Sequence, residues 1–277
     1  MYKIVAMQTL ASQTKLVKIC VPEIARKAHA GQFVILKIDE KGERIPLTLV
    51  DWESENGTIT LIFQEVGVAT KKLGSLKTGD ELLDVCGPLG NPTDIKNYGT
   101  MVIIGGGVGT APCLPIAKAL KEAGNKLISI IGARNDKLLI LESEMRKICQ
   151  EVHISTDDGS KGHKGFVSDV LKTLIEQGRS IDVVYAIGPS VMMRAVAEVT
   201  RPYGIRTIVS LNPIMVDGMG MCGACRVSVG GKVKFACVDG PEFDGHQVDF
   251  SELIKRQRAF LAEEKLALEH LEKHGGC

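Results

Sequence analysis

Three cysteines in one short segment carry the strongest chemical signal in this sequence. Cys222 and Cys225 form a C-x-x-C pair, and Cys237 follows after eleven intervening residues. Closely spaced thiolates of this kind are typical ligands of metal ions or iron–sulfur clusters. Because such sites usually take four protein ligands, the segment predicts a metal site whose fourth ligand lies outside this cysteine set.

The fourth ligand has several candidates. Plant-type [2Fe–2S] clusters use the spacing C-x4-C-x2-C and a more distant cysteine, and Asp217 stands where the first cysteine of that spacing would be. We therefore expect the Asp217 carboxylate to complete a [2Fe–2S] site with the three cysteines. One alternative is a structural Cys3His zinc site completed by His246. Another is a site completed by Cys277 or water, with Asp217 as an ordinary turn residue.

A glycine-rich turn is the second chemical signal. The stretch GGGVGTAP, which begins at Gly105, follows an apolar run and opens a helical pattern. In that context main-chain N–H groups and the N-terminus of a helix hold a pyrophosphate. Two glycines match the fingerprint G-x-G-x-x-G, and a threonine stands in the third glycine position. The residues expected to bind a nucleotide here are Gly105, Gly107, Val108, Gly109 and Thr110.

Two further segments are expected at the same edge of the sheet, because ligands of open α/β sheets bind beyond the carboxyl ends of the strands. Arg134 follows one strand-like run and can pair with a ribose or a phosphate. Gly188 and Pro189 follow another such run. We expect these three residues to contribute to the nucleotide site, although Arg134 is also compatible with an ordinary surface position.

The pattern of apolar runs divides the chain into four segments. Residues 1–97 show short apolar runs between turn signals, which predicts a small antiparallel β-barrel. Residues 98–212 alternate five strand-like runs with helical runs, which predicts a doubly wound parallel sheet. Residues 213–250 hold the cysteine loop as a small subdomain, and residues 251–277 predict a charged C-terminal helix with Ser251 as its N-cap. The expected fold class is β plus α/β.

Composition excludes several classes of protein. The chain has 277 residues and a formal net charge of +1, with no broad basic field that would favour a nucleic acid. The N-terminus lacks the pattern of a signal peptide. The longest apolar run, which begins at Met101, is too short to span a bilayer. We expect a soluble, cytoplasmic protein that binds neither nucleic acid nor membrane.

The order of barrel, nucleotide domain and cysteine loop resembles the ferredoxin–NADP reductase superfamily over essentially the whole chain. Within that superfamily the chain is most similar to the electron-transfer subunits of dihydroorotate dehydrogenase B and to the small subunits of NADH-dependent reduced ferredoxin:NADP oxidoreductases. The motifs that carry the resemblance are RIPLT from Arg44, GVAT from Gly67, GPLGNP from Gly87, GGGVGTAP from Gly105, AIGPSVMM from Ala186, and the cysteine loop.

The resemblance implies three cofactors: FAD, NAD(H) and a [2Fe–2S] cluster. In the family the first motif holds FAD with a hydroxyl near the flavin N5 edge, and the glycine–threonine segment meets the pyrophosphate. Relatives usually place an arginine directly before the proline of the first motif, where this chain has Ile45. Dihydroorotate-type subunits carry a cysteine at the position of Asp217. The implied FAD contacts are Arg44, Pro46, Leu47, Thr48, Gly67 and Thr70.

The resemblance also implies an electron-transfer flavoprotein subunit. Hydride would pass between NAD(H) and FAD without a protein acid or base, so no catalytic residue is expected. The cluster would exchange electrons with a larger flavin and iron–sulfur subunit that resembles the glutamate synthase small subunit and serves ferredoxin by flavin-based electron bifurcation. The alternative enzyme is the electron-transfer subunit of dihydroorotate dehydrogenase B. From another class, the alternative is a nucleotide-binding regulatory protein with a structural zinc.

Overall fold

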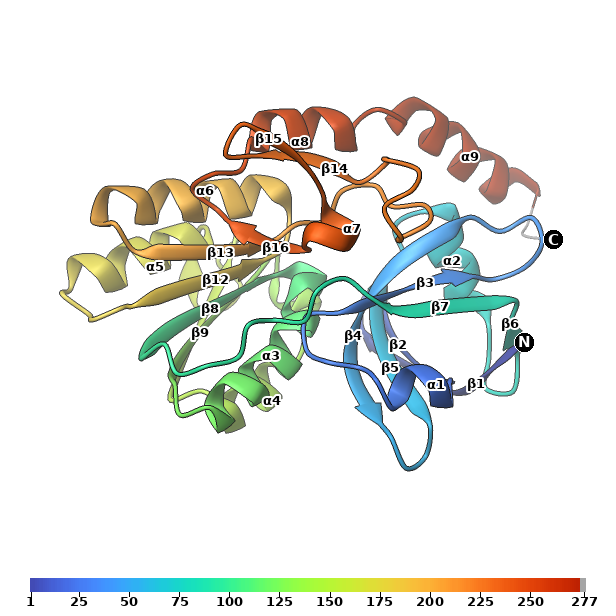
Figure 1. The fold of residues 1–277 in the computed structure, drawn as a ribbon, viewed down its shortest axis with the longest axis horizontal. Helices are drawn as coiled ribbons and strands as arrows, with labels where there is room; N and C mark the ends of the chain where they lie inside the picture. The colour runs from blue at the N-terminus through green and yellow to red at the C-terminus, as the bar shows by residue number, and fades with distance from the viewer. Residues whose placement is uncertain (275–277) are drawn as a thin grey trace.

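The computed structural model describes residues 1–274, so the expectation for Cys277 lies outside the described residues. Figure 1 shows a β-barrel and a parallel sheet side by side, with the cysteine-bearing segment lying across both. The chain then ends in two helices that run over the cysteine-bearing segment and the barrel. The positions of the functional residues follow from how these parts pack on one another.

The first part is a seven-stranded antiparallel barrel, as predicted. The sheet order is β6-β1-β2-β5-β4-β3-β7. Because only Leu83 separates β6 from β7, the two edges of the sheet meet and the barrel is nearly closed. Its elements are β1 (Tyr2–Ala11), β2 (Thr14–Cys20), α1 (Pro22–Ala25), β3 (Phe33–Lys37), β4 (Arg44–Glu53), β5 (Thr58–Gln64), α2 (Val68–Ser75), β6 (Glu81–Leu82) and β7 (Asp84–Leu89).

The second part is a sheet of order β11-β10-β9-β8-β12-β13-β16, parallel except for β16. Five of these strands were expected, whereas the short edge strands β11 and β16 were not. The order changes direction between β8 and β12, which is where open sheets of this kind bind ligands. The strands are β8 (Thr100–Gly106), β9 (Lys126–Ala133), β10 (Glu151–Thr156), β11 (His163–Lys164), β12 (Val183–Ile187), β13 (Arg206–Ser210) and β16 (Glu242–Asp244).

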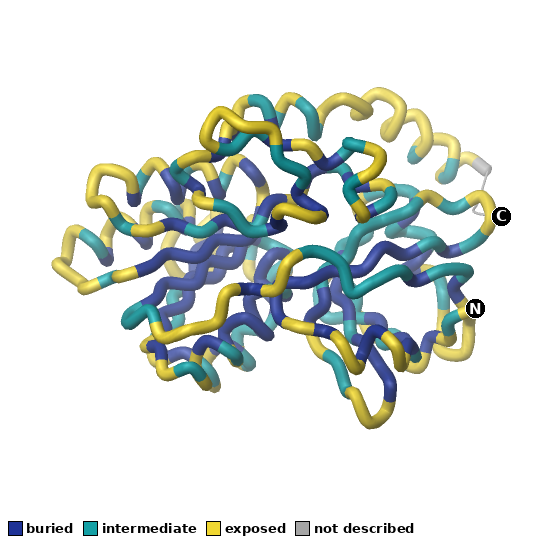
Figure 2. The backbone as a smooth tube through the Cα atoms, viewed as in Figure 1, coloured by how far each residue is buried: buried dark blue, intermediate teal, exposed yellow. Residues whose placement is uncertain are grey.

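Helices cover both faces of this sheet, which confirms the doubly wound arrangement. One apolar core joins the sheet to α3 (Thr110–Glu122) and α4 (Glu142–Ile148), and it extends to barrel residues such as Val50 and Ile62. The core on the other face joins the sheet to α5 (Val167–Glu176) and α6 (Ser190–Thr200). Short 3-10 turns are η1 (Gly107–Gly109), η2 (Asp136–Leu138) and η3 (Arg201–Tyr203). Figure 2 shows the strands as the buried centre of this part.

The cysteine-bearing segment is the least regular part. It contains the hairpin of β14 (Arg226–Val229) and β15 (Lys232–Phe235), followed by α7 (Ala236–Asp239). The next strand, β16, pairs antiparallel with β13 and so joins the edge of the parallel sheet. The segment is therefore anchored to the sheet at its end and rests on the barrel through the apolar contacts described below.

The C-terminal tail differs from the single helix that was expected. It forms α8 (Phe250–Gln257) and α9 (Leu261–His274), with turns between them. Asp249, not Ser251, caps α8, because its Oδ1 accepts a hydrogen bond of 2.9 Å from the main-chain N–H of Glu252. Helix α9 packs against α2, and an ion pair of 3.1 Å joins Lys71 to Glu272. None of the helices in residues 1–274 is both long and apolar enough to cross a membrane.

Candidate functional site

The nucleotide loop sits at the switch point of the parallel sheet. Strand β8 ends at Gly106, η1 follows, and α3 begins at Thr110. A Cβ atom on Gly109 would lie 2.5 Å from the carbonyl oxygen of Ile187 and 2.9 Å from the Cα of Gly188. This close approach lets the loop rest on the end of β12. The structure therefore brings the predicted loop together with Gly188, and Pro189 lies beside Gly106 in the same contact.

The loop has an unused polar group that fits a nucleotide. The hydroxyl oxygen of Thr110 is buried and has no hydrogen-bond partner among the described residues. Buried polar groups nearly always have a partner, so this one is suited to a ligand oxygen at the start of α3. Arg134 is exposed directly after β9, whose register with β8 places both strand ends at the same edge. The nucleotide contacts of these residues remain predictions that the geometry permits.

The barrel motif RIPLT forms the first half of β4, and its side chains alternate between two faces. Ile45 and Leu47 pack against the barrel core, so Leu47 can meet a cofactor only through its main chain. Arg44, Pro46 and Thr48 lie on the opposite face, because successive side chains of a strand point to opposite sides. The three residues expected to face FAD with their side chains therefore share one surface.

Arg44 carries a second unused polar group. Its guanidinium lies 3.5 Å from the Asp84 carboxylate, and the pair is half-exposed. Its Nε atom, however, is buried without a hydrogen-bond partner among residues 1–274. Because Arg44 stands four residues before Thr48 in β4, it lies on the face of Thr48 rather than in the barrel core. That position fits an anionic cofactor group.

The glycine–threonine segment forms the start of α2. Gly67 is the N-cap residue, and the Thr70 hydroxyl oxygen accepts hydrogen bonds from the main-chain N–H groups of Gly67 (3.0 Å) and Val66 (3.1 Å). The same hydroxyl donates to the carbonyl of Gly67. Thr70 thus stabilises the turn that begins the helix, and its predicted contact with the FAD pyrophosphate would come from this same turn.

In the cysteine loop, two short contacts each join a pair of predicted ligand residues. The sulfur atoms of Cys225 and Cys237 are buried and lie 3.1 Å apart. The Asp217 carboxylate accepts hydrogen bonds from the main-chain N–H groups of Cys222 (2.8 Å) and Met219 (3.0 Å). These bonds, with the Met219 contribution the largest, hold the pKa of Asp217 below its usual range, so the group is an anion at neutral pH.

Pairs of this kind suit a two-iron cluster, in which each iron takes two protein ligands. In the part of the chain that the structure describes, no three His, Cys, Asp or Glu side chains surround one common point as a single metal ion would require. Burial and the Cys225 thiol raise the pKa of Cys237 to about 12. A coordinated metal ion removes such a thiol proton outright, so bound iron would provide the charge that the buried thiolates need.

The zinc alternative with His246 is wrong. The Nε2 atom of His246 lies 2.9 Å from the Thr200 hydroxyl, at the end of α6. The carbonyl of His246 accepts a hydrogen bond from Arg201 in the next turn. These contacts fix the histidine against the far end of the parallel sheet rather than beside the cysteines.

The cysteine loop and the face of β4 that is expected to hold FAD share one surface of the barrel. Phe33 and Ile35 of β3 pack in one apolar cluster with Cys225 and Cys237. A Cβ on Gly218 would lie 3.0 Å from the Cδ1 of Ile35, so the loop touches the barrel closely.

In the antiparallel register, Phe33 stands opposite Thr48 and Ile35 opposite Pro46. Directly opposed residues point to the same side of a sheet. The residues that support the cysteines and the residues expected to meet the flavin are therefore immediate neighbours. Sequence reasoning missed Phe33 and Ile35, because only the strand register reveals this neighbourhood.

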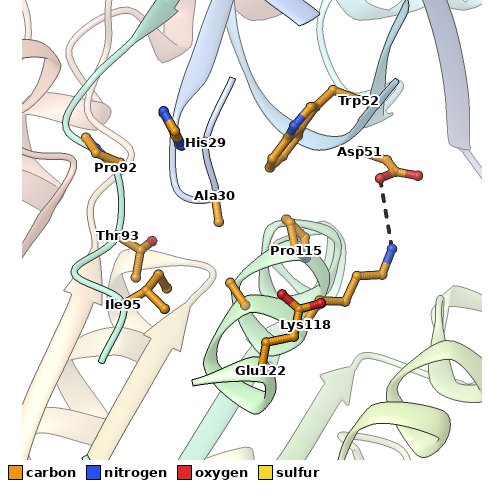
Figure 3. A pocket seen from close by; sticks show the side chains of 11 residues that line it. His29, Ala30, Asp51, Trp52, Pro92, Thr93, Ile95, Pro115, Lys118 and Glu122 are labelled. Atoms are coloured by element: carbon orange, nitrogen blue, oxygen red, sulfur yellow. Dashed lines mark ion pairs between the residues drawn. The ribbon is translucent and has the colours of Figure 1, made fainter. Parts of the chain in front are cut away.

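A separate cavity of about 460 Å³ lies between the barrel and α3. Figure 3 shows Trp52 and Asp51 on one side and Pro115, Lys118 and Glu122 of α3 on the other, with Lys118 at 3.9 Å from Asp51. Its remaining lining residues are His29, Ala30, Pro92, Thr93, Ile95 and Ala119. No predicted site residue lines this cavity, so it is not the predicted electron-transfer site.

A barrel beside a doubly wound sheet, with a glycine loop at its switch point and a paired set of cysteine ligands, defines an oxidoreductase that joins a nucleotide site to an iron–sulfur site. Two family models match. Residues 103–198 match the oxidoreductase NAD-binding domain, and residues 212–249 match the iron–sulfur cluster binding domain of dihydroorotate dehydrogenase B.

Relatives match over nearly the whole chain. The dihydroorotate dehydrogenase B electron transfer subunit homolog of Thermotoga maritima is 49% identical over 92% of this chain and 90% of its own length. The electron transfer subunit of Clostridium perfringens is 32% identical over 83% of this chain and 91% of its own length. The chain belongs to this family of dihydroorotate dehydrogenase B-type electron-transfer subunits.

Solved structures of similar proteins show the same fold. A chain of the NADH-dependent reduced ferredoxin–NADP oxidoreductase, solved in a study of flavin-based electron bifurcation, superposes with a TM-score of 0.92 at 46% identity and covers 98% of both chains. A ferredoxin–NADP reductase from Neisseria gonorrhoeae with bound FAD and NADP shares the fold, with a TM-score of 0.61 at 18% identity over 73% of this chain and 90% of that one.

Proposed function

We propose that this chain is the small electron-transfer subunit of an NADH-dependent ferredoxin:NADP oxidoreductase that works by flavin-based electron bifurcation. It binds FAD on the barrel, NAD(H) on the parallel sheet and a [2Fe–2S] cluster in the cysteine loop. The observation that carries the proposal is the shared surface on which Phe33 and Ile35 contact the cysteines while their partners Thr48 and Pro46 face the expected flavin.

The roles of the residues follow from their positions. When bound, nicotinamide and flavin exchange a hydride and flavin and cluster exchange single electrons, which is chemistry that the cofactors supply. The loop from Gly105 to Thr110 holds the nucleotide through main-chain N–H groups and the free Thr110 hydroxyl. Thr48 orients the flavin edge. Asp217 and the three cysteines hold the cluster, and Phe33 and Ile35 exclude water between the two groups.

A larger subunit receives or supplies the electrons at the cluster. Around the cysteine loop the apolar side chains of Val216, Met219, Met221 and Val238 are exposed. Exposed apolar side chains gathered at one place are typical of a protein interface. We assign this face to the larger flavin and iron–sulfur subunit, which resembles the glutamate synthase small subunit and serves ferredoxin, so the contact of this chain with ferredoxin is indirect.

Co-purification under a native tag tests the proposal. The expected partner is a single larger flavin and iron–sulfur subunit, and the isolated small subunit should contain two irons, two sulfides and one FAD. With NADPH as the donor, the complex should pass one electron of each pair to NAD and the other to oxidised ferredoxin, so that both acceptors are reduced together. A complex that needs no ferredoxin would contradict the proposal.

A second candidate is the electron-transfer subunit of dihydroorotate dehydrogenase B. The identity of 32% to the subunit of that enzyme in Clostridium perfringens favours it, whereas Asp217 in place of the usual cysteine favours the first candidate. Dihydroorotate-dependent reduction of NAD by the purified complex would establish this second function in place of the first.

A further inference from the structure

Glu242, the first residue of β16, links separate parts of the protein through one carboxylate oxygen. Its Oε1 atom accepts a hydrogen bond from the Thr93 hydroxyl and another from the Tyr185 hydroxyl. Thr93 belongs to the connection between the barrel and the parallel sheet, and Tyr185 is a fully buried residue in the middle of β12. None of the nucleotide, flavin or cluster roles proposed above uses Glu242.

The barrel approaches the same oxygen. Gly31 has a positive φ of +88°, and a Cβ atom at this position would lie 2.8 Å from Oε1 of Glu242 and 2.3 Å from the Thr93 hydroxyl oxygen. Only glycine combines this backbone conformation with so close a contact. Glu242 is therefore the point where barrel, connection, parallel sheet and cysteine-bearing segment meet.

A displacement of Glu242 would be transmitted to the cysteines through few contacts. Phe243, the next residue, packs in the apolar cluster that holds Cys225 and Cys237. Just before Glu242, the carbonyl of Gly240 accepts a hydrogen bond of 2.7 Å from the main-chain N–H of Asn91. The end of the cysteine loop is thus hydrogen-bonded to the same connection between barrel and parallel sheet that Glu242 contacts through Thr93.

The link does not depend on the charge of Glu242. The groups that face its carboxyl group are Tyr185, Thr93, Asp94 and, beside Tyr185, the buried Cys113 thiol. Burial, with a contribution from Asp94, raises the pKa of Glu242. Oε1 can accept both hydroxyl protons whether or not the other oxygen is protonated, and a glutamine amide oxygen can accept them equally.

We infer that Glu242 is a positioning residue for electron transfer, because it fixes the cysteine loop against both the nucleotide sheet and the barrel. The inference rests on the proposed function, in which electrons cross between the flavin face of the barrel and the cysteine loop. Loss of the link lets the loop shift relative to β3 and lengthens that crossing, while the nucleotide loop and the barrel keep their own geometry.

The experiment compares four variants of the full chain that carries its cofactors. Glu242→Ala removes the acceptor, Tyr185→Phe removes one donor without changing the ring, and Glu242→Gln keeps the acceptor. Glu252→Ala is the matched control, since Glu252 also accepts a hydroxyl hydrogen bond, from Ser228, but joins only α8 to β14. After rapid mixing with NADH, flavin reduction is measured by the bleaching of its absorbance, and cluster reduction is measured by freeze-quench EPR.

Glu242→Ala and Tyr185→Phe should slow cluster reduction several-fold, since the rate of electron transfer falls as the distance between the flavin and the cluster grows. Flavin bleaching should stay near the wild-type rate, Glu242→Gln should restore cluster reduction, and Glu252→Ala should change neither. Amide hydrogen exchange, which does not depend on activity, should rise in residues 236–245 of Glu242→Ala and Tyr185→Phe but not of Glu242→Gln.

Unchanged cluster reduction and unchanged exchange in Tyr185→Phe would overturn the inference, and so would equal slowing of both steps. If the wild-type chain transfers no electrons from NADH to the cluster at all, the proposed function fails instead. The exchange result still decides the positioning role in that case. If Glu242→Ala does not fold, the Tyr185→Phe and Glu242→Gln pair carries the same test.

Discussion

The nucleotide loop and the cysteine loop are held in position for their expected ligands in different ways. The nucleotide loop joins two regular elements, β8 and α3, and its fit depends on a glycine, Gly109, that rests on the carbonyl of Ile187. The cysteine loop has little regular structure of its own, and contacts with Phe33 and Ile35 of the barrel hold it in place. The first loop is thus built by the two elements next to it in sequence and packs on one further strand, whereas the second depends on residues almost 200 positions away.

This difference determines how each site can be disrupted. The nucleotide loop should respond to small steric changes, because its backbone packs directly on a neighbouring strand. The cysteine loop should respond to changes in its ligands and in the surface beneath it. A variant made within one site should therefore leave the other site nearly intact, and the control variants should leave both intact.

The largest effect is expected at Asp217. Asp217→Ala removes the proposed fourth ligand and should cost most of the iron and sulfide, while NADH affinity stays unchanged. Asp217→Cys should keep the iron and change the reduced-state EPR spectrum and the potential, because thiolate is the softer ligand. Iron and sulfide analysis with EPR measures both.

Asp239→Ala is the control, since this aspartate also accepts a main-chain hydrogen bond in the same segment, 2.7 Å from the N–H of Phe235. It should keep its iron. Full iron content in Asp217→Ala, or an unchanged spectrum in Asp217→Cys, would show that the carboxylate is not on the iron.

A smaller effect is expected at Gly109. In Gly109→Ala the new methyl group would lie 2.5 Å from the Ile187 carbonyl oxygen, which should cost about 1–3 kcal/mol of stability by overpacking. NADH affinity should fall as well, because α3 must move away from β12. Thermal unfolding and NADH titration measure the two quantities.

Gly178→Ala separates strain from ligand binding. Gly178 has a positive φ of +75°, and a Cβ there would meet nothing within 4 Å, so the cost should be about 1–2 kcal/mol of backbone strain. NADH affinity should not change. Equal losses of affinity in the two variants would contradict a specific role for the Gly109 contact.

The sequence predicts more of the first region than of the second. The alternation of apolar runs is a local signal, so the barrel, the five parallel strands and the GGGVGTAP turn follow from it. The placement of Phe33 beside Thr48 and the cysteines depends on the register of β3 and β4, which no local pattern contains. The same reason explains the missed strand β16, whose three residues owe their conformation to pairing with β13.

The helix cap of α8 shows a similar limit at smaller scale. Ser251 and Asp249 are both good N-cap residues by type, and only the start of the helix at Phe250 decides for Asp249. In the cysteine loop, the spacing predicts four candidate ligands. The contact of the Asp217 carboxylate with the main chain of Cys222 and the contact between the sulfur atoms of Cys225 and Cys237 required the structure.

The smallest effect is expected at His246. Burial, with a contribution from Arg201, lowers the pKa of this histidine. Its protonation therefore favours the unfolded state, and stability should decline as pH falls through about 6.5, the usual histidine pKa. In His246→Gln this decline should be slightly weaker, as unfolding at pH 5 and pH 8 would show.

The same variant completes the comparison of the two regions, since His246 lies against Thr200 and not beside the cysteines. Iron content should match that of the wild type, and NADH affinity should be unchanged. Loss of metal in His246→Gln would show that the histidine is a metal ligand.

Anomalous diffraction at the iron edge from crystals of the protein with its cofactors tests the central claim most directly. We predict two iron peaks, one beside Asp217 and Cys222 and the other beside Cys225 and Cys237, with the flavin on the neighbouring face of β4 at Thr48. A single zinc peak in the cysteine loop, or a flavin bound away from that face, would contradict the account.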